Sequence, residues 1–300
     1  MSLAGFFRYG LSMVALLGSM ATVAAEGENK NILLMENGGV ILVHTGQYDN
    51  EFPVNALIDG NLQNYWASGK PGPKGWQAQS FVIEMAQQYS LNKLAVDNRE
   101  VDEEAYPGVS ARKIRVSAST VSPTGPWHPV TTMEAAQFSR KELLLPKPVA
   151  ARWLKVEVLS NYGDPSYMEI NELEAYGKPM GTKQPPMDPN GVYQTNYRLL
   201  KLEVDGNRVT GCYELDKGYI HGTTDGRVFN IEWIEHKGEE RGSALLVLSS
   251  GGFLNGLWYE DGILQGPWFG NKLRTGHKIE CDPVTAAMGV GFNASTLVNH

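Results

Sequence analysis

The chain has 300 residues, and its 26 basic and 33 acidic side chains give it a net charge of −7. This length predicts two compact domains rather than one, and a mean hydropathy of −0.28 excludes a polytopic membrane protein. The acidic balance and the lack of a run of Lys and Arg exclude the backbone of a nucleic acid as a partner.

Residues 1–25 have the pattern of an export signal. One basic residue, Arg8, precedes an apolar run from Leu11 to Val23, and small residues up to Ala25 predict cleavage before Glu26. The alternative is an uncleaved anchor, although the run is shorter than the ~20 apolar residues that a span needs. We therefore expect a secreted or periplasmic protein that is not an integral membrane protein after cleavage.

The next part of the chain predicts an all-β fold. Short runs rich in Val, Ile, Leu and aromatics are separated by Gly, Pro, Asn and Ser clusters, which is typical of strands. The predicted strands are 81–85, 113–119, 142–145 and 153–159. No apolar stripe with helical period lasts three turns, so helices should be few and short.

The segment NALIDGNLQNYW, Asn55–Trp66, contains a turn rich in side-chain oxygens. Asp59, Gly60 and Asn61 are followed three residues later by Asn64. Closely spaced carboxylate and amide oxygens suit a hard cation such as calcium. A simple hydrogen-bonded turn would use the same residues, so the pattern leaves both alternatives open.

Several motifs follow one another in an order that is more specific than any one of them. NALIDGNLQNYWAS precedes QSFVIEM, IRVSAS with a GPWHPV turn, AARWLKVEV and finally INELEAYG. In this order residues 31–177 resemble a discoidin-type domain. This is the coagulation-factor type C, galactose-binding-like family, which also contains many bacterial carbohydrate-binding modules. The resemblance implies a jelly-roll β-sandwich over residues 30–178.

The resemblance also implies a structural calcium ion that pins two parts of the chain together. The matching positions here are the Ala56 carbonyl and the side chains of Asp59, Asn61, Asn64 and Glu172. Asn64 stands where the family usually has Thr or Ser. The metal-free turn therefore remains the alternative.

Ligands of the family bind to loops at one end of the sandwich. Aromatic rings stack on the apolar face of a sugar, and polar side chains hydrogen-bond to its hydroxyl groups. The candidate ligand-binding residues are His44, Tyr48, Trp76, Arg99, Tyr106, Tyr162 and Tyr167. Each could equally be an incidental exposed residue, and Trp76 is the hardest to explain by packing. By the same pattern Trp66 and Trp153 should lie in the core.

The proline-rich stretch 179–191 predicts a linker to a second domain over residues 192–282. Alternating apolar and polar residues predict strands at 198–205 and 227–235. The dipeptides Asp205-Gly206, Asp225-Gly226 and Asp261-Gly262 are typical of tight hairpins. The second domain should therefore be a small antiparallel β-meander or barrel, followed by a flexible tail over residues 283–300.

A Gly-x-aromatic pattern recurs in this domain at 211–213, 256–258 and 266–268. Glycine lets strands bend or approach closely while the aromatic residue points to the same face. Packing inside a barrel explains the pattern, and the alternative is a ligand cavity lined by Trp233, Trp258 and Trp268.

The two cysteines, Cys212 and Cys281, both fall in the second domain. A disulfide between them would contribute about 4 kcal/mol to the stability of the fold on the chain-entropy estimate. The alternative is a pair of buried free thiols. No Cys-x-x-Cys spacing occurs, so redox catalysis is not indicated.

No nucleophile elbow, zinc-protease motif or phosphate-binding loop occurs in the sequence. We therefore expect a non-enzymatic protein, with no organic cofactor, that binds a carbohydrate or other cell-envelope glycan through its first domain. The alternatives are an enzyme with its active site in the second domain, and an adhesion or structural factor that binds protein.

Overall fold

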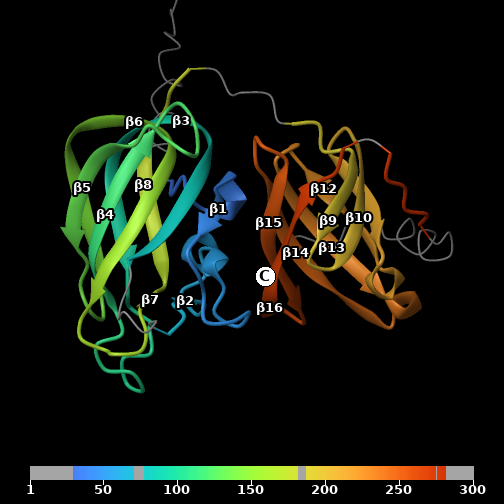
Figure 1. The fold of residues 1–300 in the computed structure, drawn as a ribbon. Helices are drawn as coiled ribbons and strands as arrows, with labels where there is room; N and C mark the ends of the chain where they lie inside the picture. Colours follow the sequence, from blue (N-terminus) through green and yellow to red (C-terminus); the bar gives the residue numbers. More distant parts are fainter. Residues whose placement is uncertain (1–29, 71–77, 182–186, 275, 282–300) are drawn as a thin grey trace, which may run out of the picture.

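The computed structural model describes residues 30–70, 78–181, 187–274 and 276–281, which form an all-β molecule in two parts (Figure 1). The helices in these ranges are short 3-10 turns: η1 Met35–Asn37, η2 Val54–Ile58, η3 Leu215–Lys217 and η4 His236–Gly238. None of the described helices is long and apolar enough to cross a membrane. The predicted signal, Trp76 and the predicted tail lie outside the described residues.

The first part is a β-sandwich built from antiparallel strands. Its main sheet has the order β1-β3-β6-β4-β5, β8 pairs with β3, and β2 pairs with β7. The strands are β1 Val40–His44, β2 Trp66–Ala67, β3 Gln79–Asp97, β4 Ala111–Ser119, β5 His128–Glu134, β6 Arg140–Asn161, β7 Glu169–Ile170 and β8 Glu172–Pro179.

Two strands are much longer than the sequence predicts. The predicted strand 81–85 is only the start of β3, and the predicted strands 142–145 and 153–159 are parts of one strand, β6. The pairing of β3 with β6 is irregular between Glu84 and Tyr89 and again between Leu91 and Lys93. Pro146 and Pro148 lie in the second irregularity, where a missing N–H donor costs no ladder bond. The prolines therefore mark a bulge rather than a strand end.

The core of the sandwich follows the period-two pattern of β6. Leu154, Val156 and Val158 are buried, and Lys155 between them is only partly buried. Trp66 is fully buried, as predicted. Trp153 is only half-buried, so its prediction as a core residue was wrong.

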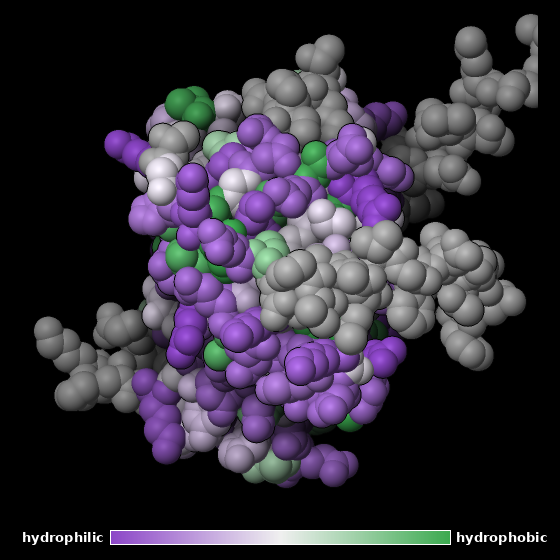
Figure 2. Space-filling model, turned by 90° about the vertical axis from the view of Figure 1, so that its right-hand side faces the viewer, coloured by the Kyte–Doolittle hydropathy of each residue, from purple (hydrophilic) through white to green (hydrophobic). Residues whose placement is uncertain are grey.

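The second part is a closed barrel of eight antiparallel strands, which confirms the predicted meander. The strands are β9 Gly191–Thr195, β10 Arg198–Asp205, β11 Arg208–Tyr213, β12 Tyr219–Thr224, β13 Val228–Glu235, β14 Glu240–Leu248, β15 Phe253–Glu260 and β16 Ile263–Lys272. The three predicted Asp-Gly hairpins are present, and Gly206, Gly226 and Gly262 all have positive φ. β16 pairs with β9 and closes the barrel. Seen from the barrel side, the surface is mostly hydrophilic (Figure 2).

The register of the barrel pairs three indoles with glycines on the neighbouring strands. Trp258 on β15 lies opposite Gly266, and Trp268 on β16 lies opposite Gly256. Trp233 on β13 lies opposite Gly242, where a Cβ atom would come within 2.5 Å of the indole. The Trp233 indole therefore occupies space that the neighbouring strand leaves by carrying glycine.

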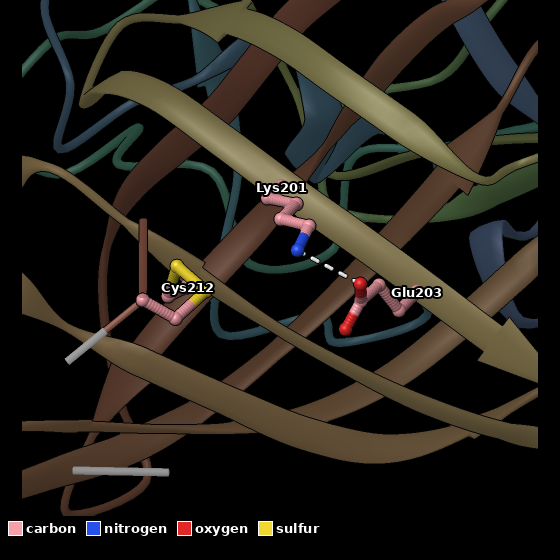
Figure 3. The surroundings of a disulfide bond; sticks show 4 residues. Lys201, Glu203 and Cys212 are labelled. Atoms are coloured by element: carbon pink, nitrogen blue, oxygen red, sulfur yellow. Dashed lines mark ion pairs between the residues drawn. A yellow bond between two sulfur atoms is a disulfide. The ribbon is translucent and has the colours of Figure 1, made fainter. Parts of the chain in front are cut away.

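Cys212 on β11 and Cys281 form a disulfide, with the two Cα atoms 5.5 Å apart. Cys212 pairs across the ladder with Lys201, which forms an ion pair with Glu203 at 2.8 Å (Figure 3). Partners across a ladder share one face of a sheet. Cys212 and its disulfide therefore lie on the same face of the barrel wall as Lys201. The disulfide fastens the segment after β16 to β11.

A buried charge cluster joins the barrel to the sandwich. Glu84 of β3, 1% exposed, accepts hydrogen bonds from Arg227 of the barrel at 2.9 Å and from Arg152 of β6 at 3.2 Å. The backbone N–H and the hydroxyl of Ser250 donate to the same carboxylate at 2.9 and 2.7 Å, and the Trp153 indole donates at 3.2 Å. Burial alone would raise the pKa of Glu84, but Arg227, Ser250 and Arg152 outweigh it and hold the pKa below its ordinary value.

A pair of asparagines makes a second polar contact across the same interface. Asn55 and Asn255 are both buried and each donates its amide to the other's oxygen, at 2.8 and 3.0 Å. The remaining amide hydrogens bond to the carbonyls of Gly256 and Ile41, both at 2.8 Å. β1 also contacts β15 at this interface (Figure 1). The two domains therefore form a joint with specific polar pairing rather than a loose tether.

Candidate functional site

Tyrosines from separate loops meet beside Ala67 of β2 and Glu169 of β7. These two strands lie at one end of the sandwich (Figure 1). Tyr167 contacts Tyr48 and Tyr106 edge-to-face, with ring centroids 5.4 and 5.5 Å apart. Phe52 lies 6.0 Å from Tyr48 and 5.0 Å from Tyr65. These rings surround a pocket of about 70 Å³, which we call the tyrosine pocket. It is lined by Tyr48, Phe52, Tyr65, Ala67, Tyr106, Tyr167 and Glu169.

Hydrogen bonds fix the backbone of the loop that carries Tyr167. The amide of Asn161 donates to the carbonyls of Asp164 and Tyr167 at 2.7 and 2.6 Å. The Asp164 carboxylate in turn accepts the N–H groups of Ser166 and Tyr167, both at 2.7 Å. These bonds hold the backbone from which the Tyr167 side chain extends.

The loop that carries Tyr106 is tied to the Tyr167 loop. The buried Glu103 carboxylate accepts the N–H groups of Gly108 and Ser110 at 2.6 and 2.8 Å. Gly108 has a φ of +90°, and a Cβ atom there would lie 2.9 Å from the Asp164 nitrogen. The carbonyl of Gly108 also accepts the Asp164 N–H at 3.2 Å. Glycine thus allows the close approach that brings the two tyrosines together.

Glu169 of β7 is a buried carboxyl group in the lining of the tyrosine pocket. Burial raises its pKa to about 7, against the lowering effect of a hydrogen bond from the Asp102 N–H, and the nearby charges of Asp102 and Asp164 raise it further. Burial likewise raises the pKa of Tyr65 to about 12. Near neutral pH the pocket therefore offers phenolic hydroxyls and a carboxyl group that can donate or accept.

The structure brings together three of the predicted ligand-binding residues: Tyr48, Tyr106 and Tyr167. His44 at the end of β1 does not line the pocket. Arg99 pairs with the buried Asp97 at 2.7 Å, and Tyr162 donates its hydroxyl to the Ala135 carbonyl at 2.7 Å and stacks against Arg112. The geometry thus assigns Arg99 and Tyr162 structural contacts.

Sequence reasoning missed Phe52, Tyr65 and Glu169. Tyr65 precedes the core residue Trp66, and alternation along β2 would have placed it on the opposite face. Glu169 gave no such signal, because a carboxylate in a short strand is usually exposed.

The predicted calcium turn has two carboxyl groups in contact. The carboxyl groups of Asp59 and Glu172 lie close enough to affect each other's pKa. Glu172 also accepts the Gly60 N–H at 2.5 Å, and Asp59 accepts the Asn64 amide at 2.7 Å. The Asn61 side-chain oxygen accepts the Gln63 N–H at 3.1 Å. Asn61 and Asn64 thus take part in hydrogen bonds of the turn itself.

The charges of this turn fit a cation. Burial raises the pKa of Glu172 to about 10, and the Asp59 charge adds to the effect. Burial raises the pKa of Asp59 to about 6. Glu172 Oε2 is buried without a hydrogen-bond partner, and no basic side chain in the described ranges forms an ion pair with either carboxylate. A partly buried and a buried carboxyl group with an orphan oxygen match the hard-oxygen donor set of calcium.

Two solved carbohydrate-binding modules are similar in fold to about half of the chain. CBM32-3 from a family 31 glycoside hydrolase of Clostridium perfringens is 18% identical, over 48% of this chain and 94% of that chain, with a TM-score of 0.42. The family 32 CBM of C. perfringens NanJ, solved with galactose, is 18% identical over 49% and 98% of the two chains, with a TM-score of 0.38.

An enzyme is among the similar structures as well. Allantoicase is 16% identical, over 49% of this chain and 43% of that chain, with a TM-score of 0.38. No curated protein matches the sequence. The family model of the F5/8 type C domain matches residues 43–173. Residues 43–173 of this chain are thus an F5/8 type C, or discoidin, domain, the family that the order of its sequence motifs predicted.

Proposed function

We propose that this protein binds a carbohydrate through the tyrosine pocket and does not act on it chemically. The observation that carries the proposal is the meeting of Tyr48, Tyr106 and Tyr167 around a small pocket on a hydrogen-bonded frame. A pyranose has an apolar C–H face that packs on aromatic rings and a rim of hydroxyls that need hydrogen-bond partners. Phenolic hydroxyls and Glu169 supply such partners.

The lining of the pocket favours binding over glycoside hydrolysis. Hydrolysis needs two carboxyl groups that flank the scissile bond. Among the residues that the structure describes, Glu169 is the one carboxyl group that lines the tyrosine pocket, and no Lys or Arg lines it. The lining thus also suits a neutral sugar better than an anionic one.

Removal of the central ring is expected to weaken glycan binding about tenfold or more. Tyr167 touches both neighbouring tyrosines, so Tyr167→Ala removes a ring that a sugar would contact and loosens two others. Loss of an aromatic anchor typically costs ~2 kcal/mol of binding. The measurement is a glycan array with the full chain after removal of residues 1–25, followed by calorimetric titration of the best sugar.

Phe138→Ala is a matched control, because Phe138 is a large exposed ring outside the pocket, 64% exposed. It should leave binding unchanged. Binding that survives Tyr167→Ala and Tyr106→Ala would contradict the site. The absence of any glycan signal would favour a protein ligand instead.

We also propose that a calcium ion occupies the turn between Asp59 and Glu172. These two carboxyl groups would hold it, with the Ala56 carbonyl as a further oxygen ligand. The ion would supply the positive charge that this turn lacks. Its place between the η2 turn and β8 would fasten the N-terminal part of the sandwich to its last strand.

Calcium is expected to stabilise the protein more at pH 8 than at pH 5. Without the ion, the protonated forms of Asp59 and Glu172 stabilise the fold, because both pKa values are raised in the folded protein. This contribution to the free energy of unfolding is fully present below about pH 4. It is lost as pH rises through about 6 for Asp59 and about 10 for Glu172. Calcium takes the place of these protons, so calcium at 100 times its Kd should add about 2.7 kcal/mol to the free energy of unfolding. The measurement is thermal unfolding with calcium, magnesium or chelator. Glu172→Gln should abolish the calcium effect, and a wild-type midpoint indifferent to millimolar calcium at pH 8 would contradict the site.

We further propose that the protein acts outside the cytoplasm. The disulfide between Cys212 and Cys281 supports this, because such bonds persist in oxidising compartments and are rare in the cytosol. Processing at the predicted site before Glu26 can be read from the N-terminal sequence of the protein recovered from its native host.

A further inference from the structure

A second pocket lies at one end of the barrel and has aromatic walls. It has a volume of about 120 Å³. Its lining residues are Tyr197, Tyr213, Leu215, Trp233, Glu235, Glu240, Trp258, Glu260 and Trp268. They come from the strand ends around the β9–β10, β11–β12, β13–β14 and β15–β16 connections. The turns that carry Arg227 and Ser250 into the sandwich are the β12–β13 and β14–β15 turns, at the opposite end of the same strands.

Five aromatic rings of this pocket form a connected set, which we call the aromatic cage. Trp233 contacts Trp258 with ring centroids 5.6 Å apart, and Tyr197 contacts Trp258 and Trp268 at 5.9 and 5.6 Å. Tyr213 contacts Trp268 at 5.1 Å. All four contacts are edge-to-face, with interplanar angles between 73° and 86°. Gly242, opposite Trp233, leaves room for that indole, because a Cβ atom at Gly242 would lie 2.5 Å from it.

The charge of the lining is negative. Glu235, Glu240 and Glu260 line the pocket, and no Lys or Arg in the described part of the chain does. His236, beside the pocket, pairs with Glu240 at 3.1 Å and offsets one of these charges when it is protonated. Glu235 accepts a hydrogen bond from the Tyr213 hydroxyl at 2.6 Å. Burial raises the pKa of Glu235, and the Tyr213 hydroxyl opposes that effect only in part.

The indole N–H groups of Trp258 and Trp233 already donate hydrogen bonds within the protein. Trp258 donates to the Tyr197 hydroxyl at 2.7 Å, and Trp233 donates to the Tyr259 carbonyl at 3.2 Å. The Trp268 Nε1 atom is buried and has no partner among the described residues. The pocket therefore offers mainly π faces and carboxylate oxygens, and both attract positive charge.

We propose that the aromatic cage binds a small organic cation of the quaternary or methylated ammonium class. An ammonium group surrounded by indole and phenol rings gains cation–π attraction, which is largest for Trp. The pocket is smaller than the ~300 Å³ of typical sites for drug-sized ligands, so it suits one headgroup rather than a larger molecule. This site shares no lining residue with the tyrosine pocket.

Choline and its uncharged carbon isostere, 3,3-dimethyl-1-butanol, test the proposal on the full chain. The two molecules have the same shape and differ in charge. Calorimetric titration should show choline binding at least tenfold more tightly than the isostere. Equal affinities would show an ordinary apolar pocket and overturn the proposal, as would the absence of choline binding to the folded protein.

Two substitutions place the binding in the cage. Trp258 is half-buried, and Trp258→Ala should weaken choline binding at least tenfold. Glu260→Gln, which keeps the side-chain shape, should weaken choline binding severalfold and leave the isostere unaffected. Phe269→Ala is the matched control, because Phe269 follows Trp268 in β16, is 41% exposed and does not line the pocket. Choline binding that Trp258→Ala and Glu260→Gln leave unchanged would place the cation elsewhere and overturn the assignment.

Discussion

Glu84→Gln is expected to lower the free energy of unfolding by about 3–5 kcal/mol. The substitution keeps the shape of the side chain but leaves Arg152 and Arg227 buried, each about 7% exposed, without their shared counter-charge. Removal of one partner from a buried ion pair costs this much because the remaining charge stays desolvated. Chemical denaturation followed by circular dichroism measures the effect.

The same variant tests whether the two domains unfold together. We expect one cooperative transition for the wild-type protein and two separate transitions for Glu84→Gln, because Glu84 carries both the Arg227 and the Ser250 contacts to the barrel. Because the pKa of Glu84 is depressed, its stabilisation is present above about pH 4.5 and is lost as pH falls through the folded value.

A surface ion pair supplies the control. Glu203→Gln removes the partner of Lys201 on the outside of the barrel, where Glu203 is 60% exposed, and should change stability by less than about 1 kcal/mol. If Glu84→Gln has an equally small effect and keeps a single transition, the buried cluster does not hold the domains together.

Loss of the disulfide is expected to cost about 4 kcal/mol, because the bond closes a loop between residues 69 positions apart. The Cys212→Ser, Cys281→Ser double variant should unfold at a correspondingly lower denaturant concentration. Reduction of the wild-type protein should bring it to the same value.

A reducing agent should leave the double variant unchanged, which separates the effect of the bond from the effect of the two serines. Cys212 is only 5% exposed, so a hydroxyl there adds a small cost of its own. If the reduced wild-type protein keeps its full stability, the segment after β16 does not contribute to the barrel.

The sequence predicted the outline of the fold because its signals there are local. The Asp-Gly hairpins of the barrel depend on residues that tolerate positive φ, and the order of short motifs identified the discoidin domain. The long strands β3 and β6 were missed because Pro146 and Pro148 normally end a strand, and only the partner strand shows that they lie in a bulge.

The joint between the domains could not be predicted, since each partner looks ordinary in its own segment. Glu84 and Arg227 are 143 positions apart, and Asn55 and Asn255 are 200 apart. Three tyrosines of the tyrosine pocket were predicted, because aromatic residues in polar loops are unusual enough to be noticed. Their meeting depends on loop packing through Gly108, which no pattern along the chain encodes.

Sugar binding in the tyrosine pocket can be observed at the tyrosine rings themselves. The most direct measurement is NMR of the full chain with ¹³C-labelled tyrosine rings, titrated with the best sugar from the glycan array. We predict that the ring signals of Tyr48, Tyr106 and Tyr167 shift together, while those of Tyr197 and Tyr213 in the barrel stay in place. Shifts confined to Tyr197 and Tyr213, or no shift of any tyrosine on sugar binding, would contradict binding in the tyrosine pocket.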